Sequence, residues 1–194
     1  MYVTAGAAYL SRTLYRGLRP DTDFVQDVVE GIKHEDVASA EVAAGWFTSD
    51  RRELRRQGVL VVPVPRSTPG RHTYPFAACM GAILGREVQP LLFRATPVPS
   101  SRLLRRQGRE GVSVKTHVAS LAAVRPEISG VDLPLLLVDD VFTRGNTLVA
   151  CTRVLRRVGW RGPISGVVAA QAVDATELTG EPALGIRGFT VRAT

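Results

Sequence analysis

The stretch from Leu133 to Thr147, LPLLLVDDVFTRGNT, decides the fold. Its apolar residues run into two adjacent aspartates, Asp139 and Asp140, and a short polar segment follows before a new apolar pattern begins. Two neighbouring carboxylates repel each other and both need solvation, so a purely structural role for them at the end of a buried strand is costly. We therefore expect a polyhydroxylated or cationic group to lie against this pair.

Apolar strand patterns alternate with helical patterns on both sides of this stretch. The sequence predicts helices at 21–46, 76–84, 118–124 and 148–158, and strands at 59–65, 88–93, 135–138 and 164–170. The strand at 59–65 is apolar on both faces, which is typical of a central parallel strand covered by helices. The alternation predicts an α/β fold, a parallel sheet with helices on both faces. The last residues predict an irregular stretch with an edge strand.

Length and composition indicate a single globular domain. The chain has 194 residues, of which 45% are hydrophobic and 22% charged. These values are ordinary for a soluble protein, and the longest apolar runs are too short to cross a bilayer. We divide the chain into a helical N-terminal part (1–50), a core (51–173) and a C-terminal extension (174–194). No segment has the pattern of a signal peptide, so we expect a cytoplasmic location and no membrane partner.

The net charge of +7 comes almost entirely from arginine. The charge is clustered at Arg51–Arg56 and at Arg102–Glu110. Such clusters attract phosphate groups, either on a nucleic acid or on a small polyphosphate, and charge alone does not choose between them.

The cysteines and histidines show no metal-binding spacing. The two cysteines, Cys79 and Cys151, lie in apolar helical patterns and are expected to be small buried groups. The three histidines are far from one another in sequence and are expected at the surface; they are His34, His72 and His117.

The segment after the aspartates has the features of an anion-binding loop. Ligands of open parallel sheets bind beyond the carboxyl ends of the strands. Residues Thr143–Thr147 open a helix, so several backbone N–H groups can converge on one anion, and Gly145 permits a close backbone approach. Carboxylates that accept from hydroxyls beside a phosphate-binding loop describe a ribose 5-phosphate site. A strand followed by a tight turn and a helix capped by Thr147 is the alternative reading.

The complete string VDDVFTRGNT, from Val138 to Thr147, resembles the PRPP-binding signature of type I phosphoribosyltransferases, V-D-D-V-x-T-T-G-x-T. One residue departs from the signature, since Arg144 stands where a small residue is usual. The resemblance implies that Asp139 and Asp140 hold the ribose hydroxyls. It also implies that the 5-phosphate is bound by Thr143, Arg144, Gly145, Asn146 and Thr147.

Other segments extend the resemblance. VLVVPVPRS is similar to the family's strand and loop that hold pyrophosphate, which implies roles for Arg66 and Ser67, and Phe93-Arg94 matches a strand ending in an arginine that contacts pyrophosphate. The basic segment Ala95–His117 lies where the family has its flexible catalytic hood, which closes over the transition state and excludes water. The hood candidates are Arg105 and Arg106 for pyrophosphate binding and Arg109 and Lys115 for catalysis. The aspartates Asp139 and Asp140 complete the implied catalytic set.

Within the superfamily, the order of these motifs over residues 32–170 is most similar to the ComF-like, competence-associated phosphoribosyltransferases. Two features depart from that group. The N-terminal cysteine zinc knuckle is absent, and GRHTYPF stands in place of the usual R-G-F-N-Q string.

The resemblance implies a transferase that moves the 5-phosphoribosyl group of PRPP to or from a nitrogen acceptor, such as a nucleobase, with release of pyrophosphate. PRPP is normally used as its magnesium complex, which implies that Asp139 or Asp140 approaches the metal, directly or through water. Several 6-oxopurine enzymes of the superfamily have an acidic residue at the position of Thr143. A threonine there argues against hypoxanthine or guanine as the acceptor.

Two alternatives from other functional classes remain open at this point. One is a non-catalytic protein that senses PRPP or a nucleotide. The other is a ComF-like accessory protein that handles DNA through its arginine clusters, whose binding would fall steeply with salt. A pyrophosphate lid explains basic residues beside a PRPP signature better than a nucleic-acid partner does. A homodimer is compatible with either class.

Overall fold

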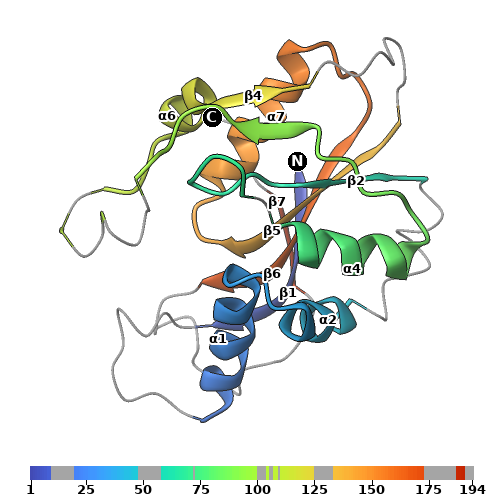
Figure 1. The fold of residues 1–194 in the computed structure, drawn as a ribbon, viewed down its shortest axis with the longest axis vertical. Helices are drawn as coiled ribbons and strands as arrows, with labels where there is room; N and C mark the ends of the chain where they lie inside the picture. Colours follow the sequence, from blue (N-terminus) through green and yellow to red (C-terminus); the bar gives the residue numbers. More distant parts are fainter. Residues whose placement is uncertain are drawn as a thin grey trace.

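The computed structural model describes residues 1–9, 20–47, 58–71, 73–99, 104, 107–108, 110–124, 133–172 and 187–190. The basic cluster at Arg51–Arg56 and three arginines of the expected hood, Arg105, Arg106 and Arg109, lie outside these residues. The elements, in chain order, are β1 (Tyr2–Tyr9), α1 (Pro20–Lys33), α2 (Val37–Gly45), β2 (Leu60–Pro63), α4 (Tyr74–Leu84), β3 (Leu92–Arg94), α6 (Val114–Ser120), β4 (Leu121–Ala123), β5 (Leu135–Phe142), α7 (Asn146–Arg157), β6 (Ile164–Ala172) and β7 (Arg187–Thr190) (Figure 1).

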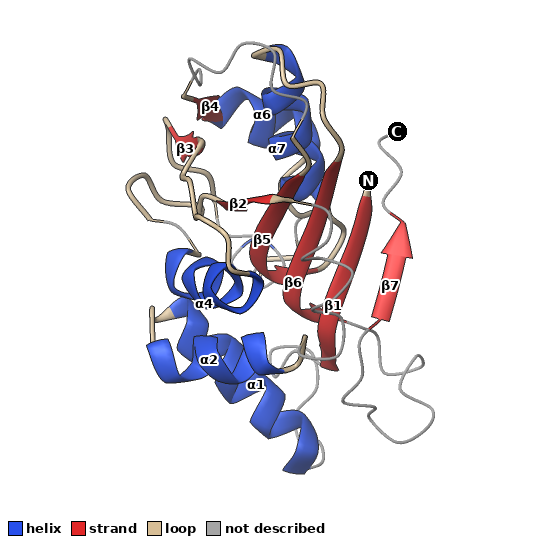
Figure 2. Cartoon of the chain, turned by 90° about the vertical axis from the view of Figure 1, so that its right-hand side faces the viewer, coloured by secondary structure: helices blue, strands red, loops and turns tan. Residues whose placement is uncertain are grey.

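The main sheet has the order β2-β5-β6-β1-β7. The first four of these strands pair in parallel, and β7 pairs antiparallel with β1. Strands β3 and β4 form a separate antiparallel pair. Alternate residues of β5 pack on opposite sides: Leu135 and Leu137 contact the cluster that contains α7, and Leu136 and Val138 contact the cluster of α1, α2 and α4. The predicted α/β fold, a parallel sheet with helices on both faces, is therefore confirmed (Figure 2).

Three predictions about elements are correct in detail. Helix α4 ends at Gly85, whose φ of 64° provides the left-handed C-cap that the sequence predicted. Helix α7 begins within the segment Thr143–Thr147, as predicted, and β7 is an edge strand. None of the helices in the described ranges combines the length and the hydropathy needed to span a bilayer.

The prediction of a helical N-terminal part is wrong for residues 2–9, which form strand β1 inside the main sheet. The expected helix at 21–46 is also two helices. Glu35 has a φ of 64°, and the side chain of Asp36 accepts from the backbone N–H of Ser39 at 2.9 Å, so a new N-cap interrupts the apolar pattern.

Strand β2 was expected at the centre of the sheet and instead lies at its edge. Its outer side is covered because Val61 donates to the carbonyl of Glu87 and accepts from the N–H of Gln89. The segment expected as a strand at 88–93 therefore contributes a single bridge, from Val88 to Val61, before β3 begins. Both faces of β2 are buried as well, since Val62 packs in the cluster that contains α7 and Val61 in the cluster of α1, α2 and α4, which explains its central-strand pattern.

The expected helix at 118–124 begins earlier and ends earlier, as α6. The Ser113 side chain accepts from the N–H of Thr116 at 3.2 Å and caps its start. Its last apolar residues form β4, because they pair with β3.

Gly81 tests the packing that covers the edge of β2. A Cβ at Gly81 would lie 2.9 Å from the Arg86 carbonyl oxygen and 2.6 Å from Val88 Cγ2. Because the backbone oxygen cannot move aside freely, Gly81→Ala should lower the free energy of unfolding by about 1–3 kcal/mol. Gly45→Ala is the matched helical control, since nothing lies within 4 Å of its Cβ. Chemical denaturation of both variants checks this, and equal stability of the two would contradict the packing.

Candidate functional site

The carboxyl end of β5 is where the apolar strand becomes polar. Residues Leu135–Val138 are at most 1% exposed, whereas Asp139 and Asp140 are partly exposed. The neighbouring end of β2 is bound to β5 here: Val64 donates to the Val138 carbonyl at 2.9 Å, and the Thr73 hydroxyl donates to the same oxygen at 2.7 Å. The two aspartates therefore lie in a part of β5 that is held on one side by the end of β2 and on the other by β6.

The loop after β5 presents unused backbone donors at a helix start. Gly145 is the N-cap of α7 with a φ of 73°, and no side chain caps this helix. Within the part of the chain that the structure describes, the N–H groups of Arg144–Thr147 donate to no other residue. Thr147 is thus not the cap that the alternative reading required. Unbonded N–H groups at and just before the positive end of the α7 dipole are the kind of donors that anions favour.

This loop and Asp139 border the same pocket. Its lining comes from the end of β5, the loop and the segment that precedes and begins α6; the residues are Gly111, Val112, His117, Asp139, Val141, Phe142, Thr143, Arg144, Gly145, Asn146, Thr147 and Leu148. The Asn146 side chain donates to the Val112 carbonyl at 2.9 Å, which ties the loop to the last residues of the expected hood. All five predicted 5-phosphate residues are therefore brought together with one of the two aspartates.

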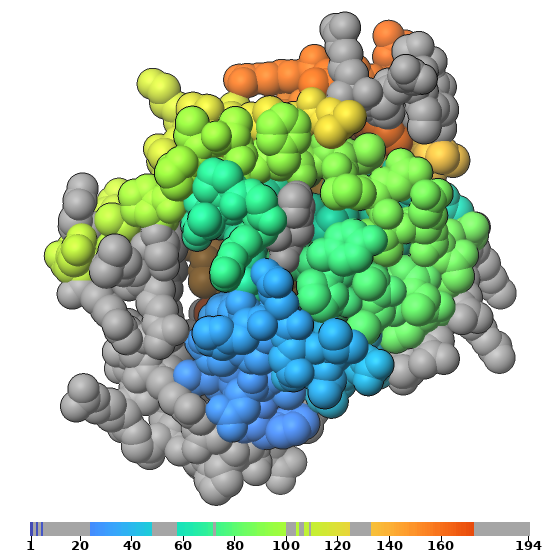
Figure 3. All heavy atoms as spheres, viewed as in Figure 1, coloured from blue at the N-terminus to red at the C-terminus, as the bar shows by residue number. Residues whose placement is uncertain are grey.

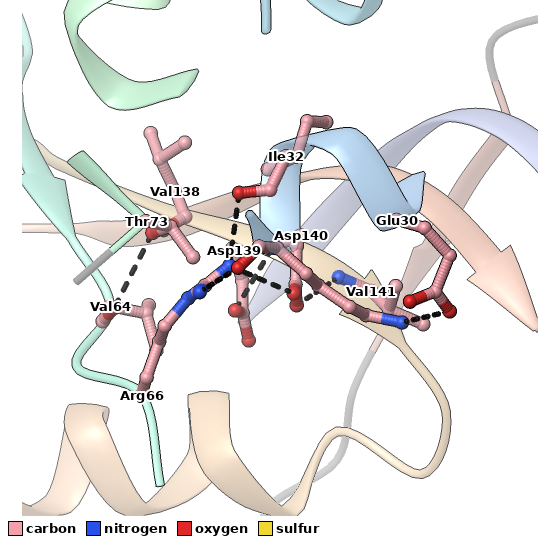
Figure 4. Close-up of polar contacts among 10 residues, drawn as sticks. Glu30, Ile32, Val64, Arg66, Thr73, Val138, Asp139, Asp140 and Val141 are labelled. Carbon is pink, nitrogen blue, oxygen red and sulfur yellow. Dashed lines mark hydrogen bonds and ion pairs between the residues drawn. The ribbon is translucent and has the colours of Figure 1, made fainter. Parts of the chain in front are cut away.

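The two aspartates have different neighbours. Burial raises the pKa of Asp139 well above its usual value, and the adjacent Asp140 carboxylate raises it further. Asp139 accepts from the backbone N–H of Asp140 at 2.9 Å, and Asp140 accepts from that of Val141 at 2.7 Å. Asp140 also lies 3.9 Å from Nη2 of Arg66 (Figure 4). A desolvated carboxyl group at the rim of a pocket gains most from a ligand that donates hydrogen bonds to it.

The Arg66 side chain is directed at the end of α1. Nη2 donates to the Ile32 carbonyl at 3.0 Å, and Nη1 donates to the Lys33 carbonyl. Both acceptors are C-terminal carbonyls of a helix, where a cation is favoured. Figure 3 shows the blue atoms of α1 and α2 beside the teal atoms of the loop after β2, and the surface is hollowed next to this contact. Arg66 therefore links α1 to Asp140.

Arg94 is 3% exposed, and its guanidinium is surrounded by protein acceptors. It donates to the carbonyls of Arg66 and Pro65 at 2.9 and 3.3 Å and to the hydroxyl of Ser120 at 2.6 Å. Burial lowers its pKa, and the charge of Asp139 opposes that shift. In this arrangement Arg94 holds the loop after β2 against α6, and a pyrophosphate contact for it stays a prediction.

The remaining predicted residues are less close to the pocket. Ser67 is partly exposed, and its carbonyl accepts from Val98 at 3.0 Å, which joins the loop after β2 to the start of the expected hood. Lys115 is exposed on α6 and does not line the pocket. The hood arginines Arg105, Arg106 and Arg109 lie outside the described residues.

His117 was expected at the surface, and this expectation is wrong. The residue is 6% exposed and borders the pocket. Its position depends on the packing of α6 against α7, which no local pattern in the sequence indicates. His34 is exposed as expected, Cys151 is buried as expected, and Cys79 is only partly buried.

The two aspartates, Asp139 and Asp140, fit a magnesium site only in part. Asp139 and Asp140 offer the hard oxygen ligands that magnesium prefers, but no group of three potential metal-binding side chains occurs within the described ranges. Two carboxylates suit an ion that takes its other ligands from a substrate and from water.

Similarity to known proteins is found among solved structures but not among family models or curated proteins. No family model matches the sequence, and a search of curated proteins finds no significant match. A solved structure of the allosteric regulatory enzyme of purine biosynthesis is similar with a TM-score of 0.37 and 19% identity, over 63% of this chain and 26% of that chain. The matched region thus spans about a quarter of that protein's length.

Because the pKa of Asp139 is raised, the free energy of unfolding should change with pH in a definite direction. The folded state holds the proton more tightly than the unfolded state, so ionising Asp139 costs stability as the pH rises above the usual value of 3.8, and this cost disappears below it. Asp139→Asn should therefore raise the free energy of unfolding by about 0.5–2 kcal/mol at neutral pH and lose the gain below about pH 4.

The control is Asp36, a carboxyl group whose pKa is shifted in the opposite direction. The pKa of Asp36 is lowered by its hydrogen bonds with Ser39, so its carboxylate stabilises the fold above pH 3.8, and Asp36→Ala should destabilise the protein at neutral pH and do so less in acid. Denaturant titrations between pH 3.5 and 7.5 test both variants. A pH-independent effect of Asp139→Asn would contradict the desolvation of this carboxyl group.

Proposed function

We propose that this protein is a phosphoribosyltransferase of the type I superfamily that binds PRPP with magnesium and exchanges pyrophosphate for a nitrogen acceptor. One observation carries the proposal: Asp139 and a loop with four orphan backbone N–H groups border one pocket at the carboxyl end of a parallel strand. The sequence of that strand and loop is the PRPP-like signature. Groups that accept from hydroxyls and groups that donate to a phosphate thus line one pocket, which supports a ribose 5-phosphate site.

The chain's own residues account for binding as follows. The N–H groups of Arg144–Thr147 donate to the 5-phosphate, and the α7 dipole adds a favourable potential. Asp139 and Asp140 accept from the ribose 2- and 3-hydroxyls, which relieves the desolvation of Asp139. Magnesium supplies charge neutralisation at the pyrophosphate when it is bound. The basic hood contributes Arg105, Arg106, Arg109 and Lys115 to the leaving pyrophosphate and excludes water from the cationic transition state.

The arrangement of Arg66 and Arg94 favours one second candidate, a non-catalytic sensor of PRPP or a nucleotide. Both guanidinium groups donate to protein carbonyls, so two of the expected pyrophosphate contacts are already used within the protein. A sensor would keep the ribose 5-phosphate end of the site and have no turnover. The two candidates share the phosphate loop and differ at the pyrophosphate end.

A screen of purine, pyrimidine and amine acceptors with PRPP and magnesium, read as pyrophosphate release, tests the proposal. We expect release with at least one nitrogen acceptor, and we expect Asp139→Asn combined with Asp140→Asn to abolish PRPP binding while the fold is retained. Unchanged PRPP affinity in the double variant would reject the ribose assignment. PRPP binding without release for any acceptor would support the sensor.

The phosphate loop can be tested at Gly145. Valine is strained at a φ of 73° and places its side chain on the path of the backbone to the anion. Gly145→Val should weaken ribose 5-phosphate binding by roughly 10-fold to 100-fold, the loss of one charge-assisted hydrogen bond. Gly159→Val carries similar strain, since its φ is 98°, but lies in the turn after α7. Calorimetry should show normal affinity for this control, and normal affinity for both variants would mean that the anion binds elsewhere.

Replacing the three hood arginines separates an enzyme from a sensor. If the hood closes mainly at the transition state, Arg105→Ala, Arg106→Ala and Arg109→Ala together should depress kcat far more than PRPP affinity. Arg161→Ala, at an exposed arginine in the turn before β6, controls for the loss of one positive charge from the surface. Steady-state kinetics and PRPP calorimetry measure the two effects. A loss confined to PRPP affinity would count against a catalytic hood.

A further inference from the structure

His117 occupies a position that links the expected hood to the phosphate loop. Helix α6 begins two residues after Val112, whose carbonyl accepts from Asn146 of the loop at 2.9 Å, and the helix packs against α7 (Figure 2). His117 lies in this short helix and borders the pocket that Asp139 and the loop also line. Its ring is thus beside the space in which the four orphan N–H groups can hold an anion.

The imidazole is buried and incompletely satisfied. His117 is 6% exposed, and its Nδ1 is buried with no hydrogen-bond partner within the described residues. Burial lowers the pKa of His117 to about 4, and the nearby charge of Arg94 lowers it as well. At neutral pH the ring is therefore uncharged, with one N–H donor and one acceptor nitrogen.

The groups around His117 have other partners. The Ser120 hydroxyl donates to the His117 carbonyl at 2.9 Å and accepts from Arg94 at 2.6 Å. Arg94 donates its other hydrogen bonds to the carbonyls of Pro65 and Arg66. Because buried polar groups are rarely left without a partner, a buried histidine that borders a pocket and has an incompletely bonded ring points to a partner that enters through the pocket.

We propose that His117 is a ligand-contacting residue that donates a hydrogen bond from its imidazole to a phosphate oxygen of a phosphate monoester held by Arg144–Thr147. The inference rests on the proposed function, because the pocket must receive the 5-phosphate of ribose. A neutral N–H adds a directional donor beside the backbone amides without placing a second cation next to Arg94. This role differs from that of the hood arginines, since it acts on the phosphate that stays on the sugar.

The test uses ribose 5-phosphate as the probe and calorimetry at pH 7.5 on the full chain. His117→Leu should weaken binding about tenfold, as expected for one hydrogen bond to a charged group. His117→Asn or His117→Gln keeps an N–H donor near the position of one ring nitrogen, and at least one of the two should recover part of the affinity. His34→Leu, at an exposed histidine that directly follows α1 and does not line the pocket, is the matched control and should bind normally.

A second readout covers a variant that fails to fold. In the wild-type protein, the imidazole nitrogen resonances of His117 should shift when ribose 5-phosphate is added, and those of His34 should not. Normal affinity in His117→Leu would overturn the inference alone. Resonances of His117 that do not move at saturating ribose 5-phosphate would also overturn the inference, because they would indicate that the ring only packs against its neighbours. Failure of the wild-type protein to bind ribose 5-phosphate would overturn the proposed function together with the inference, and this separates the two.

Discussion

The partial burial of a carboxyl group at the end of an apolar strand is the constraint on which the rest of the site depends. Strand β5 is completely covered up to Val138, and Asp139 then meets both a desolvated environment and the charge of Asp140. Ionising a carboxyl group in that position costs free energy, and hydrogen-bond donors reduce this cost. The protein supplies the backbone N–H of Asp140 to this carboxyl group and leaves the pocket side open to a ligand. Binding and folding therefore have opposite requirements at Asp139, which is common at functional sites.

Two arginines connect this constraint to the surrounding elements. Arg66 lies between Asp140 and the last carbonyls of α1, so a cation serves a helix C-terminus and a carboxylate at once. Arg94 is buried between the loop after β2 and Ser120 of α6, and its charge also acts on Asp139 and His117. Through these contacts the pocket, the loop after β2 and the end of the expected hood form one polar unit. A ligand that changes the charge at Asp139 would change the electrostatic environment of each of these parts.

The sequence was sufficient for elements that local patterns determine and insufficient where long-range packing decides. Strand β5, its loop and α7 follow from apolar spacing and from Gly145, and the end of α4 follows from Gly85. Strand β1 was missed because its alanines have weak strand propensity, and its pairing with β6 outweighs that preference. His117 was missed because its burial comes from the packing of α6 on α7. The motif around Arg94 likewise could not tell whether the guanidinium faces a ligand or protein carbonyls.

The central claim is that the carboxyl end of β5 holds a ribose 5-phosphate. A crystal structure of the protein grown with ribose 5-phosphate tests this most directly, because it locates the sugar and the phosphate separately. The account predicts the phosphate within hydrogen-bond distance of the backbone N–H groups of Arg144–Thr147, with the 2- and 3-hydroxyls at Asp139 and Asp140. Phosphate density at another surface, or an empty pocket at millimolar ligand, would contradict it.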